Sequence, residues 1–416
     1  MKHFLSFFLL CVLASCYTHN AHSQTRAYIA NSNFGSPGAI SVINTRTNAI
    51  ISTITVGRLP VGVSVSPDNT KVYVANKFSN NVSVITTSND VVIATILVGT
   101  DPTGLSINPN GTKVYVANQG ASTVSVINTN TNTIDATINV GNSPTGVSVS
   151  PDGTRVYVTN QGNGTAPGTV SVINALTNTI SATITIGITP IGISVSPDGT
   201  KVYAVNQASD NVSVIDTNTN TVSATITVGD VPSGVSVSPD GTKVYVANAD
   251  SRTVSVINTS TNIISATIPI NINYPSGCSI SPDGTKVYVA NYASNSVSVI
   301  DTNTNTVSTT IAVGFGPSCL GNIFAVFSDP TTATDNSLST QVKVAPNPSL
   351  GVFSVDFGGI NVSKSLVRVY NAQGTSVDTR KADNNMSISL ENMPAGIYFL
   401  EVSTEKGTIL KKLIKE

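Results

Sequence analysis

The stretch Ser238-Pro239-Asp240-Gly241-Thr242-Lys243-Val244-Tyr245-Val246-Ala247-Asn248 decides the fold, because close copies of it recur through most of the chain. Seven tyrosines mark the copies at intervals of 42 to 46 residues: Tyr28, Tyr73, Tyr115, Tyr157, Tyr203, Tyr245 and Tyr288. A period of this size is that of one four-stranded propeller blade. The sequence therefore predicts a repeat protein with seven blades.

One repeat contains four short segments with strand character. In the copy around Tyr245 they are 234–238, 244–247, 254–257 and 265–268, bounded by Gly, Pro, Asp or Asn. The first mixes Gly and Ser with valine, which suits a crowded axis, and the second is apolar on both faces. The fourth alternates Thr or Ser with apolar residues. We expect the first strand of each blade innermost and the fourth outermost.

The first and last repeats share one blade. The repeat region begins with the second strand of a blade, at Tyr28, and it ends with an additional first-strand segment, 317–326. The first-strand segments lie near Gly62, Gly104, Gly146, Gly192, Gly234, Gly277 and Ser318. Segment 317–326 is therefore predicted to complete the blade of Tyr28, which removes two frayed ends.

The repeat also carries a family resemblance. Val-Tyr-Val-Ala-Asn after Ser-Pro-Asp-Gly, followed by Val-Ser-Val-Ile-Asp-Thr and Ala-Thr-Ile-x-Val-Gly, resembles the YVTN repeat family over roughly residues 25 to 328. The resemblance implies a seven-bladed β-propeller of the kind found in surface-layer and other exported proteins. It implies no particular activity, because one fold hosts many functions.

The N-terminus has the pattern of an export signal. A short basic end precedes the apolar run 4–13, which is too short to span a bilayer as a helix. Small residues before Gln24 predict cleavage between Ser23 and Gln24, so 1–23 is the predicted signal peptide. An alternative stays open: Leu13-Ala14-Ser15-Cys16 resembles a bacterial lipobox and would make the chain a lipoprotein lipidated at Cys16.

Composition agrees with an exterior location. Charged residues make up 10% of the chain, against about 25% in ordinary globular domains, so Thr, Ser and Asn must hydrate the surface. The formal net charge of -1 gives no general attraction to nucleic acid or to an anionic membrane. No second apolar run is long enough for a transmembrane segment. We expect a secreted protein or one on the outer cell surface.

After the propeller, assigned to 24–328, the character of the sequence changes. Residues 329–341 are rich in Thr, Ser and Asp and predict a linker. Residues 342–416 contain alternating strands separated by turn signals, which predict a small β-sandwich. The predicted fold class is all-β, a seven-bladed β-propeller followed by a small β-sandwich domain.

The tail carries four distinctive motifs: Pro346-Asn347-Pro348, residues 367–374, residues 393–398 and Lys411-Lys412. Together they resemble the type A C-terminal sorting domain of the type IX secretion system of Bacteroidetes. The resemblance implies that 342–416 engage this secretion machinery and a sorting peptidase that removes them. Release, or attachment to surface lipopolysaccharide, would follow. Such cargo uses a cleaved signal peptide, which favours cleavage before Gln24 over the lipobox.

Three polar positions recur from blade to blade, and each has a structural explanation. The turn aspartates Asp68, Asp152, Asp198, Asp240 and Asp283 fit their Pro-Asp-Gly turns better than a metal or acid ring. One cation per blade follows this turn, and we expect its charge to be solvated and offset by the neighbouring aspartate. The alternative is that these cations form a ring that binds an acidic polysaccharide. They are Lys71, Lys113, Arg155, Lys201, Lys243 and Lys286. The asparagines Asn31, Asn76, Asn118, Asn160, Asn206, Asn248 and Asn291 are expected to cap turns by bonding nearby backbone.

Function is expected where the blades differ. The loops between second and third strands, and between one blade and the next, share one face of the disc and hold the variation, including the insert 162–168. The candidate ligand-binding residues there are Arg58, Phe78, Asp101, Arg252, Tyr274, Tyr292 and Phe315, with Gln119, Gln161, Gln207, Asp230 and Asp250 as further unusual side chains. Tyr, Phe and Arg can stack on a sugar or anchor a protein, so an extracellular glycan or protein is the expected partner.

The predicted mature chain contains few residues of the types that most enzymes use for catalysis. All histidines, His3, His19 and His22, precede the predicted cleavage site, and no glutamate precedes Glu391. Triads that need histidine and His-ligated metals are thereby excluded from the mature chain. No catalytic residue, metal ligand or cofactor is assigned, although an Asp-lined calcium site stays possible. The rival hypothesis is an extracellular lyase or glycosidase that uses Asp and a metal on the variable face.

Two cysteines remain after the signal region, Cys278 and Cys319. They lie at neighbouring repeat positions on the inner strands of adjacent blades. An exported protein can form a disulfide there that locks the ring, and two buried free thiols are the alternative.

Overall fold

The computed structural model describes residues 24–33, 37–318, 321, 323–327, 342–357, 362, 365–371, 376–383, 385–404 and 407–416. Contacts divide the chain into two compact units: Thr25–Phe327 is one, and the other holds the C-terminal sheets. Residues 1–23 and 329–341, the predicted signal peptide and linker, lie outside the described residues. Among the described helices, none has the length and apolar character needed to cross a membrane.

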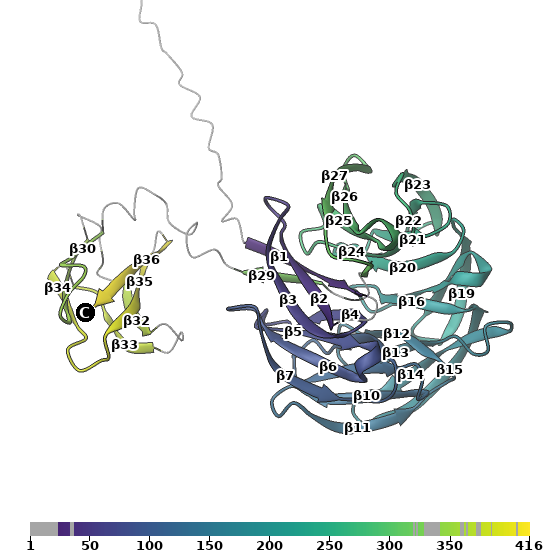
Figure 1. Ribbon diagram of the computed structural model, residues 1–416, viewed down its shortest axis with the longest axis horizontal. Helices are drawn as coiled ribbons and strands as arrows, with labels where there is room; N and C mark the ends of the chain where they lie inside the picture. Colours follow the sequence, from purple (N-terminus) through teal and green to yellow (C-terminus); the bar gives the residue numbers. More distant parts are fainter. Residues whose placement is uncertain are drawn as a thin grey trace, which may run out of the picture. The chain divides into compact units, whose positions relative to one another are not determined.

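Unit Thr25–Phe327 consists of seven antiparallel sheets around a central axis (Figure 1). The innermost strands are β4 (Pro60–Val65), β8 (Pro102–Ile107), β12 (Pro144–Val149), β16 (Pro190–Val195), β20 (Pro232–Val237), β24 (Pro275–Ile280) and the pair β28 (Pro317–Ser318) and β29 (Phe324–Phe327). The second strands are β1 (Gln24–Asn31), β5 (Lys71–Asn76), β9 (Lys113–Asn118), β13 (Arg155–Asn160), β17 (Lys201–Asn206), β21 (Lys243–Asn248) and β25 (Lys286–Asn291).

The outer half of each blade completes the four-stranded sheet. The third strands are β2 (Pro37–Asn44), β6 (Asn81–Thr86), β10 (Thr123–Asn128), β14 (Pro167–Asn174), β18 (Asn211–Asp216), β22 (Thr253–Asn258) and β26 (Ser296–Asp301). The outermost strands are β3 (Ala49–Arg58), β7 (Val91–Leu97), β11 (Thr133–Asn139), β15 (Thr179–Ile188), β19 (Thr221–Thr227), β23 (Ile263–Pro269) and β27 (Thr306–Ala312). Three loops after second strands contain the short 3-10 helices η1 (Lys77–Ser79), η2 (Gln207–Ser209) and η3 (Tyr292–Ser294). The predicted seven-bladed propeller and its inner-to-outer strand order are confirmed.

Burial follows the predicted radial order. The second strands are buried on both faces, and their seven tyrosines are among the largest fully buried side chains. The outermost strands alternate exposed and less exposed residues, as in β7. At the axis the inner strands approach so closely that a Cβ on Gly62 would lie 2.3 Å from the carbonyl oxygen of Thr103 in the next blade. Glycine is therefore required there by close backbone contact.

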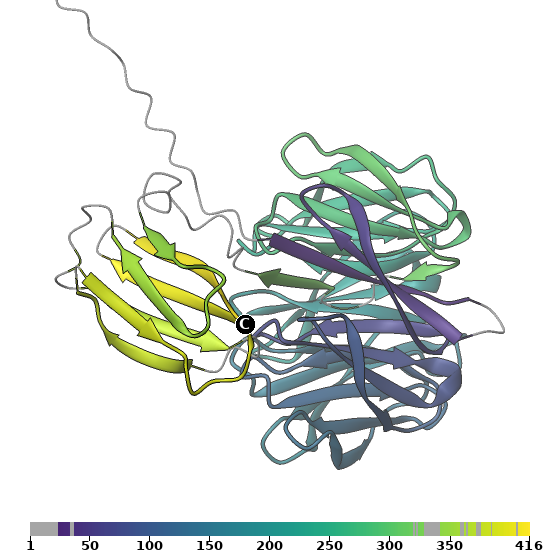
Figure 2. The ribbon, with the colours of Figure 1, turned by 60° about the vertical axis from the view of Figure 1, so that its left-hand side comes forward.

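The ring closes as predicted, with both ends of the propeller in one blade. β28 pairs with β1 through Ser318 and Ala30, and the amide of Tyr28 donates to the carbonyl of Ile323 (2.9 Å). β29 also pairs with β1, and the two strands lie side by side in Figure 1 and Figure 2. Phe324 packs edge-to-face on Tyr288 of the preceding blade, with ring centroids 5.2 Å apart.

The asparagine that ends each second strand is structural, but the expected bond to turn backbone is wrong. In all seven blades its Nδ2 donates to a serine hydroxyl of the third strand at 2.9 to 3.0 Å. The pairs are Asn31 with Ser41, Asn76 with Ser83, Asn118 with Ser125, Asn160 with Ser171, Asn206 with Ser213, Asn248 with Ser255, and Asn291 with Ser298. The amide thus ties two strands together instead of capping a turn.

The second unit is the predicted β-sandwich. Its two sheets have the orders β30-β31-β34 and β33-β32-β35-β36. The strands are β30 (Lys343–Ala345), β31 (Val352–Asp356), β32 (Leu366–Asn371), β33 (Ser376–Lys381), β34 (Asn385–Ser389), β35 (Gly396–Thr404) and β36 (Gly407–Lys415). Phe353 and Ile388 of the first sheet share one buried core with Val369 and Leu400 of the second.

Replacing Asn206 by alanine should destabilise the propeller. The side chain is fully buried and donates to Ser213 and Asn211, so its loss removes two buried hydrogen bonds and opens space beside Gly187. We expect a loss of about 1–3 kcal/mol in the free energy of unfolding, measured by urea denaturation. Asn303→Ala, in an exposed turn, is the matched control, and equal stability of the two variants would contradict the structural role.

Candidate functional site

A channel runs along the propeller axis. It encloses a cavity of about 520 Å³ lined by the inner strands and by Gly321 of the closing segment. The lining side chains are mainly valine, isoleucine and serine, as in Val147, Ile193 and Ser236. The predicted mixture of small and β-branched residues in the first strands therefore produces a channel lined by apolar side chains and hydroxyl groups.

The channel widens at one end into a second cavity of about 720 Å³, which we call the channel mouth. Both cavities are lined by Val61, Lys77, Thr103, Ile191 and Ser276, so they meet. The other residues lining the mouth are Ser32, Leu59, Pro60, Gln207, Ser233, Tyr274, Tyr292, Ala293, Gly316 and Ser318. Pro60, Ser233 and Ser318 belong to the starts of inner strands, and the others come from the loops after second strands and between blades, on the face where the blades were predicted to differ.

One repeat position contributes five of its seven side chains to the lining of the channel and its mouth. It is the residue after each buried asparagine, and we call its seven members the mouth ring: Ser32, Lys77, Gln119, Gln161, Gln207, Ala249 and Tyr292. Each backbone amide of the mouth ring donates to a carbonyl of the inter-blade loop at 2.9 to 3.1 Å. The ring therefore has a repeated backbone and variable side chains.

The carbonyls that accept these bonds belong to residues with left-handed backbone. They are Leu59, Asp101, Ser143, Thr189, Val231, Tyr274 and Gly316, with φ between 51° and 61°, and each precedes a proline. A positive φ is costly for non-glycine residues, above all β-branched ones such as Thr189 and Val231. The bond from the mouth ring helps to hold each loop in this conformation.

Side chains of the mouth ring bond to one another across blades. Lys77 Nζ donates to Gln119 Oε1 (2.7 Å), and Gln119 Nε2 donates to Gln161 Oε1 (3.2 Å). The ammonium group requires an acceptor, so it fixes which end of the Gln119 amide faces it. Elsewhere at the mouth Tyr274 and Tyr292 meet edge-to-face, with ring centroids 6.2 Å apart.

Of the seven candidate ligand-binding residues, the structure brings two together. Tyr274 and Tyr292 line the mouth, whereas Arg58, Phe78, Asp101, Arg252 and Phe315 are not among its lining residues. Lys77 and Ser32 were missed. The signal that reveals them is the column after the repeated asparagine, in which one lysine stands among mostly uncharged amides and hydroxyls.

On the opposite face, the turn aspartates serve the turns as predicted. In one copy Asp240 accepts hydrogen bonds from the Ser238 hydroxyl (2.5 Å) and from the backbone and hydroxyl of Thr242. These donors hold the pKa of Asp240 below its usual value. Within the part of the chain that the structure describes, no group of three or more His, Cys, Asp or Glu could hold a metal ion.

The cations beside these turns are not simply solvated, which corrects our expectation. Each donates to a main-chain carbonyl after the third strand of the next blade, and Arg26 belongs to the same ring. The donor and acceptor pairs are Arg26 with Thr87, Lys71 with Thr129, Lys113 with Ala175, Arg155 with Thr217, Lys201 with Thr259, Lys243 with Thr302, and Lys286 with Thr45. Seven blade junctions are bridged in this way, so these charges are engaged in assembly.

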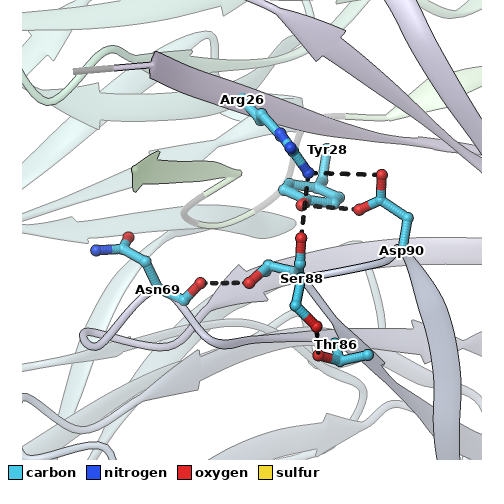
Figure 3. A network of polar contacts seen from close by, with 7 residues as sticks. Arg26, Tyr28, Asn69, Thr86, Ser88 and Asp90 are labelled. Atoms are coloured by element: carbon cyan, nitrogen blue, oxygen red, sulfur yellow. Dashed lines mark hydrogen bonds and ion pairs between the residues drawn. The ribbon is translucent and has the colours of Figure 1, made fainter. Parts of the chain in front are cut away.

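One junction is distinct because Asp90 stands where the other blades have asparagine (Figure 3). Tyr28 donates to Asp90 Oδ1 (3.2 Å), and Arg26 lies 3.6 Å from Asp90 Oδ2. Burial raises the pKa of Tyr28, and the neighbouring carboxylate adds to the rise. The cluster joins β1, the second strand of the closing blade, to the next blade.

Cys278 is buried, with its sulfur 3.3 Å from the carbonyl oxygen of Tyr245. Burial raises its pKa. Its suggested partner Cys319 lies outside the described residues, so the disulfide stays a prediction.

Two family models match parts of the chain. Residues 343–416 match the secretion system C-terminal sorting domain, and residues 41–139 and 130–231 match the seven-bladed β-propeller lactonase family. The sorting domain indicates secretion by a type IX system to the cell surface or extracellular space, and implies contact with that machinery. The finer assignments, YVTN repeats and type A sorting, stay predictions.

Solved structures share the propeller fold. Hydrazine synthase of Kuenenia stuttgartiensis is 24% identical, with a TM-score of 0.59, over 64% of this chain and 89% of that chain. A functionally unknown protein from Desulfotomaculum acetoxidans DSM 771 is 18% identical, with a TM-score of 0.62, over 72% of this chain and 99% of that chain. No curated protein matches the chain. At these identities the likeness shows the fold alone.

The turn aspartates should make the propeller sensitive to acid. A carboxyl whose pKa is lowered by folding stabilises the native state above its unfolded pKa, and this contribution is lost as pH falls through the folded value. In urea unfolding across an acid pH series, Asp240→Asn should therefore lose less stability on acidification than the parent protein. Asp250→Asn, at an exposed loop position, is the control. Identical pH slopes for the parent and Asp240→Asn would count against this account.

Proposed function

We propose that this protein is an exported binding module whose channel mouth takes an extracellular glycan or protein segment. The observation that supports this most is the coincidence of a cavity of about 720 Å³ with the face on which the blades differ. A concave, largely apolar site with a few polar groups is the usual form of a ligand-binding pocket. On the opposite face, the repeated charges are engaged in turns and blade junctions.

The chemistry of the mouth favours binding over acid–base catalysis. Of the described residues that line the two channel cavities, none carries a carboxylate, an imidazole or a thiol, and Lys77, Tyr274 and Tyr292 are the only ones that ionise. General acid–base catalysis needs a group that exchanges protons near neutral pH. The tyrosine pair and the amides instead offer ring stacking and hydrogen bonds.

Enzymatic activity is the second candidate, because residues 41–231 fall within the matches to the lactonase family. A lactonase, or the lyase or glycosidase type considered from the sequence, would need Asp residues and a metal such as calcium on the loop face. Hydrolysis of an aromatic lactone or an aryl glycoside, abolished by a chelator and by Asp101→Asn, would favour this candidate. Saturable binding without turnover favours the binding module.

Export supplies the setting for this binding. We propose that the signal peptide 1–23 is cleaved before Gln24, that the chain then passes through the type IX system, and that a sorting peptidase removes 342–416. The alternative is a lipoprotein acylated at Cys16. Support comes from the sorting-domain match over 343–416 and from the separation of the propeller, Thr25–Phe327, from the C-terminal sheets.

The intact mass of the native protein should report both processing steps. We expect a chain that begins at Gln24 and ends within 329–341, because the sorting domain is a compact unit apart from the propeller. Mass spectrometry of protein from the culture medium and from washed cells measures this directly. A full-length chain with acylated Cys16 would overturn the proposed route and leave the propeller on a lipid anchor.

Tyr292→Ala should abolish ligand binding if the mouth is the site. The mature protein is applied to an array of neutral and acidic oligosaccharides, and the variant is compared with the parent on every glycan that binds. Loss of an aromatic contact at the centre of a site should weaken binding by about tenfold or more. Phe78→Ala, an exposed aromatic residue on the same loop face outside the lining, is the matched control. Equal binding by both variants would exclude the mouth.

A further inference from the structure

We infer that the channel mouth selects a ligand that carries a carboxylate on a ring, with the carboxylate at Lys77 and the ring at the tyrosine pair. This inference rests on the proposed function and names the ligand class of the same site. A uronic-acid sugar and an aromatic acid share this chemistry. The argument depends on charge, on the direction of the hydrogen bonds, and on the rigidity of the loops.

Among the described residues that line the mouth, Lys77 carries the one charge. Lys77 lines both channel cavities, and none of their described lining residues is a carboxylate. Among the ion pairs of the described chain, none involves Lys77. A cation bordered by apolar walls is less screened than one on an open surface, so it attracts an anion more strongly.

The hydrogen bonds of the mouth ring leave donors in excess. Lys77 Nζ donates a hydrogen bond to Gln119 Oε1, and Gln119 Nε2 donates one to Gln161 Oε1. The acceptor oxygens of both amides are thus engaged, whereas the ammonium group keeps further N–H groups and Gln161 keeps its amide donors. Lys77 and Gln119, which line the channel in neighbouring blades, therefore present donors that suit the oxygens of a carboxylate.

The tyrosine pair supplies the surface for a ring. Tyr274 is 41% exposed and Tyr292 is half-buried, and both line the same cavity as Lys77. Their edge-to-face contact holds the two rings at an interplanar angle of 60°. Aromatic side chains in such pairs are well ordered and present an apolar face to a sugar or an aromatic ring. One cavity thus offers a charged donor and an aromatic surface.

The backbone prepares this arrangement before the ligand arrives. Leu59 and Tyr274 have φ values of 51° and 59°, and their carbonyls accept the amides of Lys77 and Tyr292 at 2.9 and 3.0 Å. Strained loops held by such bonds lose little freedom when a ligand binds. The cation and the tyrosines are thus tied to the same repeated framework.

Ligand-observed NMR titrations of the mature protein test this inference. The probes form two matched pairs, trigalacturonate with galactotriose and benzoate with benzamide, so that the sugar and aromatic sources are distinguished. We expect the acidic member of at least one pair to bind about tenfold or more tightly than its neutral partner, and its affinity to fall as salt rises. Lys77→Met should lower the affinity of the protein for that acid by about 10- to 100-fold.

Three further variants separate the charge from the fold. Lys77→Arg should restore binding of the acid, and Gln161→Ala should weaken it less than Lys77→Met. Arg46→Gln removes one exposed positive charge from the opposite face and should leave the affinity unchanged. Unfolding curves of all variants establish that each is folded.

The outcomes distinguish this inference from the proposed function. If neutral partners bind as tightly as acids, and Tyr292→Ala abolishes binding while Lys77→Met does not, the mouth is a binding site and the carboxylate preference is wrong. If binding is insensitive to every mouth variant, both proposals fall. If neither acid binds at millimolar concentration while an array glycan still depends on Tyr292, only the ligand class is overturned.

Discussion

The structure depends on the close approach of neighbouring blades at their buried second strands. At six junctions a glycine at or just beyond the end of the outermost strand packs directly on the buried asparagine of the next blade, as Gly187 does on Asn206, where an added Cβ would lie 2.6 Å from the asparagine side chain. The same asparagine is tied to a serine of its own blade. A cation on the other side of each junction reaches a carbonyl of the next blade. These contacts set a constant blade spacing, and only a constant spacing lets seven blades close into a ring.

The seventh junction is the exception, and it coincides with the candidate site. The segment Ile270-Asn271-Ile272-Asn273-Tyr274, which precedes the blade of Asn291, has no glycine. Tyr274 at its end lines the channel mouth together with Tyr292. A repeat whose packing is strict elsewhere is therefore relaxed at the inter-blade loop that contributes an aromatic side chain, Tyr274, to the cavity. Departures from the repeat carry more functional information than its repeated residues, because those are already explained by packing.

The fold could be predicted from the sequence because strand order and blade number follow from a local pattern. The contacts between blades could not, since they join residues such as Lys201 and Thr259 that lie in different repeats. The buried asparagines were correctly assigned a structural role but given the wrong partner, because a turn and a neighbouring strand both offer acceptors nearby. Arg58 and Phe78 were selected for their chemistry, whereas four of the residues that line the cavity, Lys77 among them, share one repeat position. Asp90 was detectable in the same way, as an acid in a column of asparagines.

On a surface with few charges, a single charged side chain has a larger share in attracting a ligand. Only 10% of the residues are charged, and seven cations of the propeller are already bonded across blade junctions. Fields from distant groups are therefore weak, and an ion approaching the loop face responds mainly to the nearest unpaired charge. At the mouth that charge is Lys77, held by the backbone bond from its amide to Leu59. In such a protein, ligand selection depends on the position of a few side chains more than on net charge, which is why a chain with a formal net charge of -1 can still present a site for an anion.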